Sequence, residues 1–479
     1  MLFNSLEFAL FFPVVVGLYF ALPPRARTAL LLCASCLFYM AFIPAYILIL
    51  AVTIGIDYTA GLLLERATGR VRNVLLATSI VATCAVLFVF KYFHFFADTF
   101  VGMAGLVGWH LNSPAVRIIL PIGLSFHTFQ SLSYVVEVYY CRQKAEKNFL
   151  TYATYVMFFP QLVAGPIERP QNLLHQFCAS HNFDYDRITD GLRRMAWGFF
   201  KKVVVADRLA LYVNDVYAAP AQFNGLQLTV ATVFFAYQIY CDFSGYSDIA
   251  LGSARVLGFK LMENFDSPYH SRSIAEFWHR WHISLSTWFR DYLYIPLGGS
   301  RVSRPRWYIN LLLTFTVSGL WHGAAWTYVA WGALNGTYLV IGILTKDTRD
   351  KIIGRLGIDP AGLARSAMSL AATFGLSCAA WVVFRAQSMS DAWYILTHFF
   401  RGWDVGTIHT EQFLLRQMPV AVLAVAFVEL VELTRGLVSI PRLVAARPLV
   451  LRWSVYMLFV LAVVLFGVYR SNQFIYFQF

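Results

Sequence analysis

Apolar residues fill most of this chain in stretches of about twenty, and short polar connections separate the stretches. An α-helix rises about 1.5 Å per residue, so about twenty apolar residues cross the hydrocarbon core of a bilayer. The pattern therefore predicts an all-α polytopic membrane protein with about 11–12 transmembrane helices. The expected spans are Glu7–Leu22, Thr28–Pro44, Tyr46–Leu64, Leu75–Phe96, Arg117–Tyr139, Gly191–Tyr217, Leu226–Leu257, Trp307–Leu320, Trp326–Leu344, Ser366–Phe384, Leu414–Leu433 and Leu451–Val468.

Residues 149–167 depart from this spanning pattern. They are apolar, but basic residues flank both ends, and Pro160, Gly165 and Pro166 interrupt a helix. Broken backbone is tolerated at membrane depth only where protein or a cavity surrounds it. We therefore expect a re-entrant segment here.

Residues 271–295 form a second unusual segment. Aromatic and aliphatic residues recur every three or four positions and predict one helical stripe, while His279, His282 and Ser286 fall on an adjacent stripe. Its charged residues, among them Arg280 and Arg290, are too many for a lipid-exposed span. The helix either lies on the membrane surface or tucks into the bundle with its histidine stripe facing a cavity, and we favour the second arrangement.

Composition supports a membrane protein and changes how the net charge is interpreted. Of 479 residues, 58% are hydrophobic and 13% are charged, whereas a soluble chain carries about a quarter charged residues. A net charge of +12 would indicate nucleic acid as a partner of a soluble protein. Here it is explained by Lys and Arg in cytoplasmic loops, so we expect membrane lipids and no nucleic acid as partners.

Loop charges predict how the chain is oriented in the membrane, and the cysteines bear on whether it binds a metal. Arg25 and Arg27 follow the first span and Arg70 and Arg72 the third, whereas the intervening connections have few cations. The positive-inside rule then places both termini outside the cytoplasm. The seven cysteines are scattered through mostly apolar segments, so we expect no metal site. Without internal repeats or linkers, residues 1–479 are expected to form a single membrane domain.

Trp321-His322-Gly323 lies where one apolar run ends and the next begins, which predicts a tight hairpin. Gly319 and Gly323 leave room beside the imidazole for a substrate or for neighbouring backbone. Histidine takes and returns a proton near neutrality because its unperturbed pKa is about 6.5. A histidine that serves packing alone is the alternative, but a second histidine motif lies close in the sequence and favours chemistry at His322.

Trp281-His282 is that second motif. If His282 shares a helical face with Ser286, its imidazole can orient a ligand or polarise a carbonyl. An interfacial helix with Trp and His at headgroup level explains the motif equally well.

Two carboxylates lie inside the apolar run 226–257. Asp242 and Tyr246 are one helical turn apart, as are Ser244 and Asp248, so each pair can hydrogen-bond locally. Acids at membrane depth are costly and mark functional sites by default. They either brace neighbouring helices or orient a histidine, and we favour a functional or supporting role.

The basic turn at residues 298–306 carries Arg301 and Arg304 beside a Gly-Gly pair, and Arg290 precedes it. Most such loops only set topology. Guanidinium groups beside flexible glycine also suit a polyphosphate such as that of coenzyme A, so these three arginines are candidate donor-binding residues.

These motifs together resemble the membrane-bound O-acyltransferase family, and within it the branch that acetylates bacterial exopolysaccharides such as alginate. The matching stretches, in the expected order, are Pro121–Phe126, Ala164–Pro166, Asp242–Asp248, Phe277–Trp288, Arg290–Ile295, Leu320–Gly323 and Trp381–Ala386. Two positions depart from the pattern: His279 stands where the family usually has Arg, and His127 where it often has Tyr.

The resemblance implies that His322 is the catalytic histidine and that His282 is the second active-site residue. It also implies helices around a central funnel or tunnel. We expect His322 to act as general base in a site without a metal. The residues expected to support the site are Asp242, Asp248, Tyr246, Trp281, Ser286, Trp321 and Gly323.

The resemblance further implies an acyl donor from the cytoplasm, acetyl-CoA or an acyl-carrier thioester, and no permanently bound cofactor. The acceptor is a hydroxyl of an extracytoplasmic polysaccharide, reached with a periplasmic partner of the SGNH acetyltransferase type. The expected location is the bacterial cytoplasmic membrane. A transporter or channel for a glycan precursor or anion, or a polytopic scaffold, remains the alternative.

Overall fold

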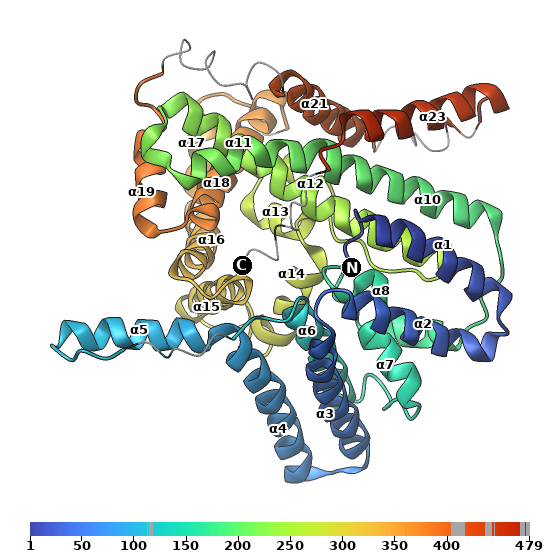
Figure 1. Ribbon diagram of the computed structural model, residues 1–479. Coiled ribbons are helices and arrows are strands. Elements are labelled where there is room, and N and C mark those ends of the chain that lie inside the picture. The colour runs from blue at the N-terminus through green and yellow to red at the C-terminus, as the bar shows by residue number, and fades with distance from the viewer. Residues whose placement is uncertain are drawn as a thin grey trace. The chain divides into compact units, whose positions relative to one another are not determined.

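The computed structural model describes residues 1–112, 114, 118–359, 361–403, 417–435, 443–444, 446–469 and 475. Every regular element in these ranges is helical (Figure 1). The chain divides into two compact units, each described by itself below. The first unit comprises Met1–Met195 and Ile249–Met262, and the second comprises Ala196–Asp248 and Glu263–Phe479.

The first unit consists of helices joined mostly by short connections. Its α-helices are α1 (Leu6–Ala21), α2 (Pro24–Met40), α3 (Ile47–Arg66), α4 (Gly69–Leu87), α5 (Phe93–Leu106), α6 (Leu124–Tyr139), α7 (Phe149–Met157), α8 (Phe159–Leu162) and α9 (Pro170–Leu173). Short 3-10 segments, η1 (Pro44–Tyr46) and η3 (Leu174–Cys178), and a π-helical segment, η2 (Phe88–Tyr92), complete it. The π-helical turn η2 lies between α4 and α5. Turns of this kind commonly bend a helix.

Helices α3, α4 and α6 pack together around a buried carboxylate. Asp57 on α3 accepts hydrogen bonds from Ser79 Oγ at 2.8 Å and from Thr83 Oγ1 at 3.0 Å, both on α4. The approach of α3 to α6 is close, because a Cβ on Gly61 would meet the Tyr134 ring at 2.6 Å. Asp57 thus links α3 to α4 through hydrogen bonds from two uncharged hydroxyl groups.

The helix break expected within residues 149–167 is present. Helix α7 ends at Met157, α8 is a single turn, and no helix resumes until Pro170. Residues 151–167 are buried throughout, and the Tyr155 carbonyl accepts from the side-chain amides of Gln130 and Gln161. Protein therefore surrounds the broken backbone, which is the condition for such a break at membrane depth.

The second unit contains the segments that carry both histidine motifs. Helices α10 (Tyr185–Phe199) and α12 (Gly225–Leu257) each have residues in both units. The α-helices that lie wholly in the second are α11 (Asp207–Ala218), α13 (Ile274–Arg280), α14 (Ile283–Phe289), α15 (Arg304–His322), α16 (Trp326–Leu344), α17 (Lys346–Arg355), α18 (Leu363–Arg385), α19 (Met389–His398), α21 (Met418–Thr434) and α23 (Leu449–Phe466). Shorter segments are η4 (Phe200–Ala206) and η7 (Arg290–Tyr294), both π-helical, and η5 (Pro220–Gln222) and η6 (Pro268–His270), both 3-10.

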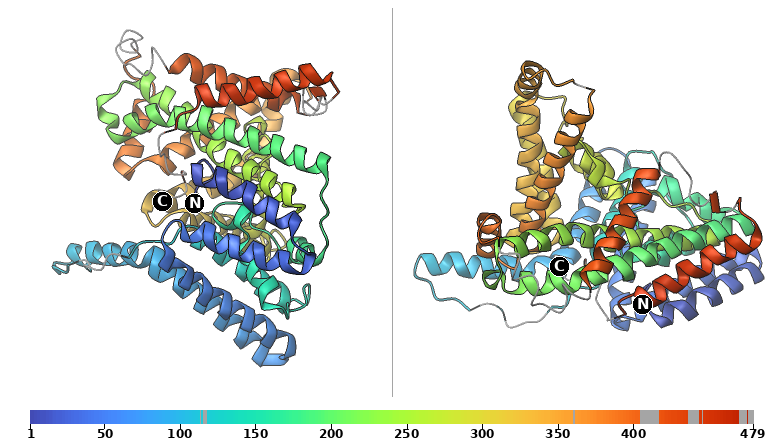
Figure 2. Two further views of the ribbon diagram at one scale, coloured as in Figure 1. Left: turned by 45° about the vertical axis from the view of Figure 1, so that its right-hand side comes forward. Right: turned by 90° about the horizontal axis from the view of Figure 1, so that it is seen from above.

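Helices α15, α16 and α18 run side by side, as Figure 2 shows. The first two form the tight hairpin predicted around His322, since α15 ends at His322 and α16 begins at Trp326. Their backbones nearly touch, because a Cβ on Gly332 would lie 2.3 Å from the Phe315 carbonyl oxygen.

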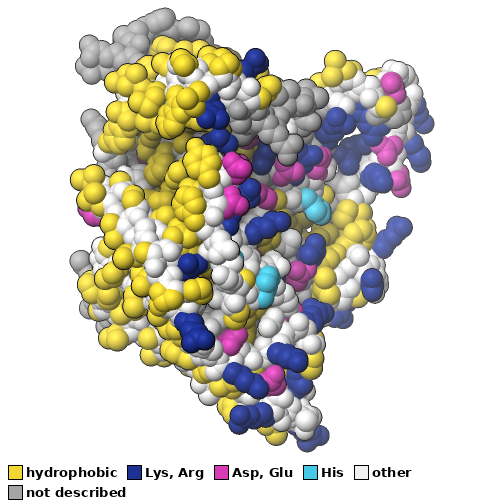
Figure 3. Space-filling view, turned by 90° about the vertical axis from the view of Figure 1, so that its right-hand side faces the viewer, with side chains coloured by type: hydrophobic (Ala, Val, Ile, Leu, Met, Phe, Trp, Pro, Cys, Tyr) yellow, Lys and Arg dark blue, Asp and Glu magenta, His cyan; other side chains and the backbone are white. Residues whose placement is uncertain are grey.

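Each expected span overlaps an observed helix, but residues 41–43 and 118–123 are not helical, so the helix expected over Arg117–Tyr139 begins at Leu124. Arg117 and residues 414–416 lie outside the described residues. Within the described residues, five helical stretches are long and apolar enough to cross a membrane, and Leu6–Ala21 is a shorter apolar helix. The five are Pro44–Arg66, Gly69–Leu106, Trp326–Leu344, Leu363–Arg385 and Leu449–Phe466. Broad areas of exposed hydrophobic side chains and separate groups of Lys and Arg are visible in Figure 3. The chain is an all-α polytopic membrane protein.

Candidate active site

The segment that carries His282 is not one continuous helix, so that prediction was wrong. Helix α13 ends at Arg280, and His282 has left-handed backbone angles, φ 42° and ψ 55°, before α14 begins at Ile283. His282 is fully buried, whereas His279 is exposed. The histidines therefore do not share a stripe, because the left-handed residue redirects the chain between the two short helices.

Backbone hydrogen bonds to residues 264–266 hold this break in place. The N–H of Ile283 donates to the Asn264 carbonyl at 2.9 Å, and the N–H of Asp266 donates to the Arg280 carbonyl at 3.0 Å. A non-glycine residue in the left-handed region is uncommon and costs free energy, so surrounding contacts must enforce it. Such strain gathers at functional sites, and here it falls on the histidine.

The Asn264 side chain fixes the protonation pattern of His282. Its Oδ1 accepts from the Ser284 N–H at 3.2 Å and from Ser284 Oγ at 2.9 Å. Because a backbone N–H only donates, this atom is the amide oxygen, and it lies 3.0 Å from His282 Nδ1. Nδ1 must therefore carry a proton, which leaves Nε2 of the neutral ring as an acceptor. The Asn264 amide nitrogen donates to Ser247 Oγ on α12 at 3.3 Å.

His322 is the last residue of α15 and is also buried. Its ring meets Trp331 edge-on at 5.1 Å between centroids and Phe384 at 5.7 Å. A Cβ on Gly323 would lie 2.2 Å from the Tyr328 ring. The sequence left two uses for the glycines beside His322: space for a substrate, or close approach of a neighbouring segment. In the structure Gly323 allows close packing against Tyr328 of α16.

Both imidazoles approach the indole ring of Trp321. Trp321 lies against both rings, with its centroid 5.1 Å from His322 and 6.5 Å from His282. A second aromatic path runs from His322 through Trp331 and Trp381, whose centroids are 5.8 Å apart, to Trp281. The sequence motifs on α13–α14 and on α15–α16 thus meet in one buried aromatic site.

The carboxylates on α12 pair with two adjacent lysines of η4. Lys201 Nζ lies 2.6 Å from Asp248 and donates to Ser244 Oγ at 2.9 Å, while Lys202 Nζ lies 2.6 Å from Asp242. Lys202 also reaches Asp207 at 2.9 Å. Removing one partner of a buried ion pair is costly because the remaining charge has lost its compensation.

These contacts favour the bracing role of the acids, since the amide of Asn264 is the group seen to orient His282. Asp242 has a further contact, because its Oδ2 accepts from the N–H of Ile475 at 2.8 Å. Tyr246 is buried on the same helix as Asp242. The α12 motif thus links η4 to residue 475 near the end of the chain.

The remaining predicted residues lie on or near the α13–η7 segment. Ser286 Oγ donates to the Trp281 carbonyl at 3.1 Å, so the hydroxyl stabilises the helix break. Arg290 is exposed and pairs with Asp291 at 2.8 Å, and Arg301 and Arg304 are exposed as well. These arginines are therefore accessible to a charged ligand from solution.

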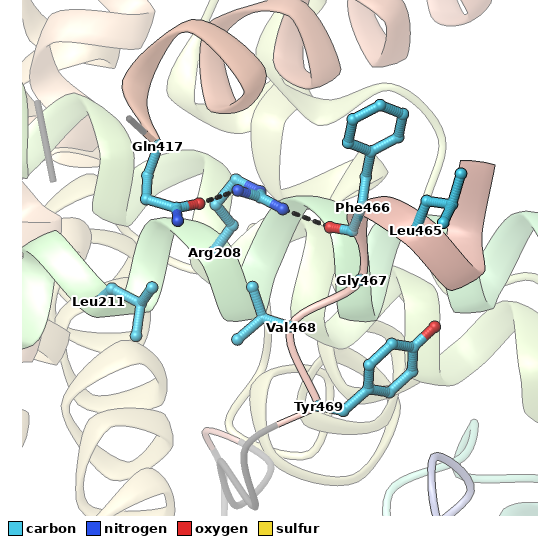
Figure 4. Close-up of a pocket in the computed structure, with 8 residues that line it drawn as sticks. All are labelled: Arg208, Leu211, Gln417, Leu465, Phe466, Gly467, Val468 and Tyr469. Atoms are coloured by element: carbon cyan, nitrogen blue, oxygen red, sulfur yellow. Dashed lines mark hydrogen bonds between the residues drawn. The ribbon is translucent and has the colours of Figure 1, made fainter. Parts of the chain in front are cut away.

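A hollow in the second unit involves a different set of residues (Figure 4). Arg208 projects into it and donates to the Gln417 side chain and to the Phe466 carbonyl, while Leu211 and Tyr469 contribute to its wall. None of the residues predicted for the active site is among those lining it.

Three residues that the sequence analysis missed are central to this geometry: Asn264, Lys201 and Lys202. Two adjacent lysines inside the apolar stretch 191–217 were a usable signal, because cations at membrane depth need partners. Asn264 carried no such signal, because its role depends on a helix break that periodicity did not reveal.

Comparison with known proteins decides the family. The family model described as MBOAT, membrane-bound O-acyltransferase family, matches residues 78–352, a range that includes both histidine motifs. The chain belongs to the membrane-bound O-acyltransferase family. It is a membrane O-acyltransferase.

Relatives from several bacteria support this membership. A probable alginate O-acetylase AlgI of Azotobacter vinelandii is 38% identical over 435 residues, 89% of this chain and 84% of that protein. A protein of the same name from Pseudomonas aeruginosa is 39% identical over 435 residues, 88% of this chain and 80% of that one. A peptidoglycan O-acetyltransferase of Helicobacter pylori is 33% identical over 429 residues, 83% and 79% respectively.

Proposed function

We propose that this O-acyltransferase moves an acetyl group from a cytoplasmic thioester, such as acetyl-CoA or an acyl-carrier protein, to a hydroxyl of an extracytoplasmic polysaccharide. Alginate-like exopolysaccharides are the favoured acceptors, because relatives at 38–39% identity carry names for alginate O-acetylation. A periplasmic partner of the SGNH acetyltransferase type is proposed to complete the transfer. The enzyme is placed in the bacterial cytoplasmic membrane, with residues 1–479 acting as one membrane domain.

The observation that carries this proposal is the pair of buried imidazoles, His282 and His322, at two interruptions of the helical backbone. A buried imidazole is costly to keep at membrane depth and marks a functional site there. Packing alone needs neither a strained backbone at His282 nor an amide that holds its proton on one nitrogen.

His322 acts in this proposal as the general base. Its imidazole takes the proton of the acceptor hydroxyl, and the hydroxyl oxygen attacks the thioester carbonyl. When the carbon–sulfur bond breaks, the thiolate leaves with the proton that the imidazolium returns. Such acid–base help is worth roughly a hundredfold to ten-thousandfold in rate.

His282 orients the acceptor hydroxyl in this proposal. Its proton lies on Nδ1, which faces Asn264, so Nε2 accepts a hydrogen bond from an alcohol. Polarising a carbonyl through Nε2 would need a second proton, and burial away from water disfavours a doubly protonated ring. The geometry therefore supports the first of the two roles expected for His282. The exposed Arg290, Arg301 and Arg304 are proposed to contact the donor phosphates.

The test uses the full-length protein in lipid nanodiscs, acetyl-CoA labelled in its acetyl group, and alginate with the outer-face partner. We expect release of the coenzyme A thiol and transfer of label to the glycan, both reduced at least a hundredfold in His322→Ala. His398→Ala is the matched control, because His398 ends α19 and lies outside the proposed site. Half of wild-type transfer in a folded His322→Ala protein would overturn the role of His322.

A parallel measurement on the protein in liposomes separates this function from transport. A transporter or channel moves intact solute across liposome membranes without liberating a thiol. A scaffold shows neither thiol release nor flux. Thiol release that depends on His322 supports an acyltransferase acting on a thioester donor.

A further inference from the structure

A histidine and two glutamates of the second unit meet at a place that the acyl-transfer proposal does not use. His270 ends η6, and Glu429 and Glu432 lie three residues apart on α21. One ligand atom from each lies within 4.8 Å of the others. His270 precedes Glu429 by 159 positions, so sequence motifs gave no sign of this group.

The geometry of this group is close to that of a metal site. His270 Nε2 lies 2.8 Å from Glu429 Oε2. Two ligand atoms each about 2.0–2.1 Å from a tetrahedral zinc ion lie roughly 3.3 Å apart, so small side-chain adjustments open the space for an ion. The His270 and Glu429 side chains are 21% and 25% exposed, which gives an ion a path from solution.

A tyrosine supports one of the two carboxylates. Tyr240, a buried residue of α12, donates its hydroxyl to Glu432 Oε1. Hydrogen bonds of this kind orient the carboxylates of metal sites and tune their affinity. Glu429 and Glu432 are also the only charged residues of α21, an otherwise apolar helix in which two carboxylates three residues apart repel each other.

We propose that His270, Glu429 and Glu432 bind one divalent transition-metal ion of the zinc type. One imidazole nitrogen and two carboxylates suit such an ion, with water completing the coordination. The ion would tie α21 to the loop that leads into α13. Tyr269, adjacent to His270, packs on Trp281 at 6.1 Å and accepts from Trp381 Nε1 at 3.1 Å, so this clamp would steady the wall beside His282.

The competing explanation is a plain ion pair between His270 and Glu429. The hydrogen bond to Glu429 raises the pKa of His270, as expected for such a pair. An ion pair, however, needs one carboxylate, and it does not explain why Glu432 is held at the same place by Tyr240.

The test measures metal binding directly and needs no acyl donor, so its outcome is independent of the proposed function. The full chain, purified through a removable tag without histidines, is stripped with chelator, titrated with Zn²⁺ or Co²⁺, and analysed for bound metal. We expect one ion per chain, visible absorption bands of bound Co²⁺, and a melting temperature that rises with Zn²⁺.

His270→Ala, Glu429→Gln and Glu432→Gln should each weaken binding at least a hundredfold, and Tyr240→Phe about tenfold to a hundredfold. His175→Ala and Glu276→Gln are the matched controls, since neither belongs to the group, and should bind as the wild type does. Glu432→Asp keeps the carboxylate and should retain measurable binding, which guards against a misfolded Gln variant. Equal metal content in wild type and the three ligand variants would overturn the proposal, as would a wild type that binds no ion.

Discussion

Asn264 presents its amide oxygen to Nδ1 of His282 at 3.0 Å and thereby decides which nitrogen of that ring can accept a proton. The oxygen is identified by the Ser284 N–H, a group that only donates. A neutral amide thus orients the His282 imidazole, whereas a carboxylate orients the histidine of the serine-protease triad.

Asn264→Ala should slow acyl transfer without removing either histidine. The change leaves the Nδ1 proton and the Ser284 groups without their acceptor, which costs about 1–3 kcal/mol, or roughly a tenfold to hundredfold loss in rate. Turnover of thioester measured as thiol release checks this, with the exposed Asn182→Ala as control. Unchanged turnover in a folded variant would show that Asn264 is not a positioning residue.

Asn264→Asp should change the pH dependence of the same reaction. A carboxylate against Nδ1 stabilises the imidazolium, so the pKa of His282 rises, by about one to three units for a close pair. Protonated His282 no longer offers Nε2 as an acceptor, so activity is lost at higher pH than in the wild type. A pH–rate profile from pH 5 to 9 checks the direction, and an unshifted acid limb would contradict it.

Lys202→Met should destabilise the fold more than the loss of an exposed ion pair does. Asp242 and Asp207 would both lose a buried cation at 2.6 and 2.9 Å, and such a loss costs about 3–5 kcal/mol. Arg280→Gln breaks the more exposed pair with Glu276 and should cost at most about 1 kcal/mol. Thermal unfolding in detergent compares the two, and equal melting temperatures would count against a buried network.

The α15–α16 hairpin allows a comparison of two glycines. In Gly319→Ala the new Cβ would lie 2.2 Å from the Tyr328 carbonyl oxygen, so we expect a loss of about 1–3 kcal/mol and displacement of His322. Gly342→Ala meets nothing within 4 Å and should stabilise α16 by up to about 1 kcal/mol. Melting temperature and turnover are the measurements, and a Gly319→Ala protein as stable as Gly342→Ala would contradict the close approach.

Loop charge predicts which side of the membrane each connection faces. In a cysteine-free background, Arg70→Cys at the start of α4 should resist a membrane-impermeant maleimide in intact spheroplasts, whereas Leu111→Cys should react. Both should react after the membrane is permeabilised. The reverse labelling pattern would invert the proposed orientation.

The all-α membrane architecture, the hairpin at His322 and the helix break within residues 149–167 could all be predicted from sequence pattern. Each of these follows from local rules: helix length, the position of Gly and Pro, and the need to cover apolar surface. The same rules misled at residues 271–295, where regular spacing predicted one helix and the left-handed His282 divides it in two.

The pairing of polar side chains, by contrast, became visible only in the folded chain. Asn264 and His282, Lys202 and Asp242, and His270 and Glu429 are pairs separated by 18, 40 and 159 positions. Periodicity describes the faces of a single helix, whereas these contacts arise where different segments pack and their buried polar groups must find partners. Sequence pattern therefore pointed to the two histidines, whereas packing supplied the amide beside His282, the rings around both imidazoles and the lysines that pair with the carboxylates of α12.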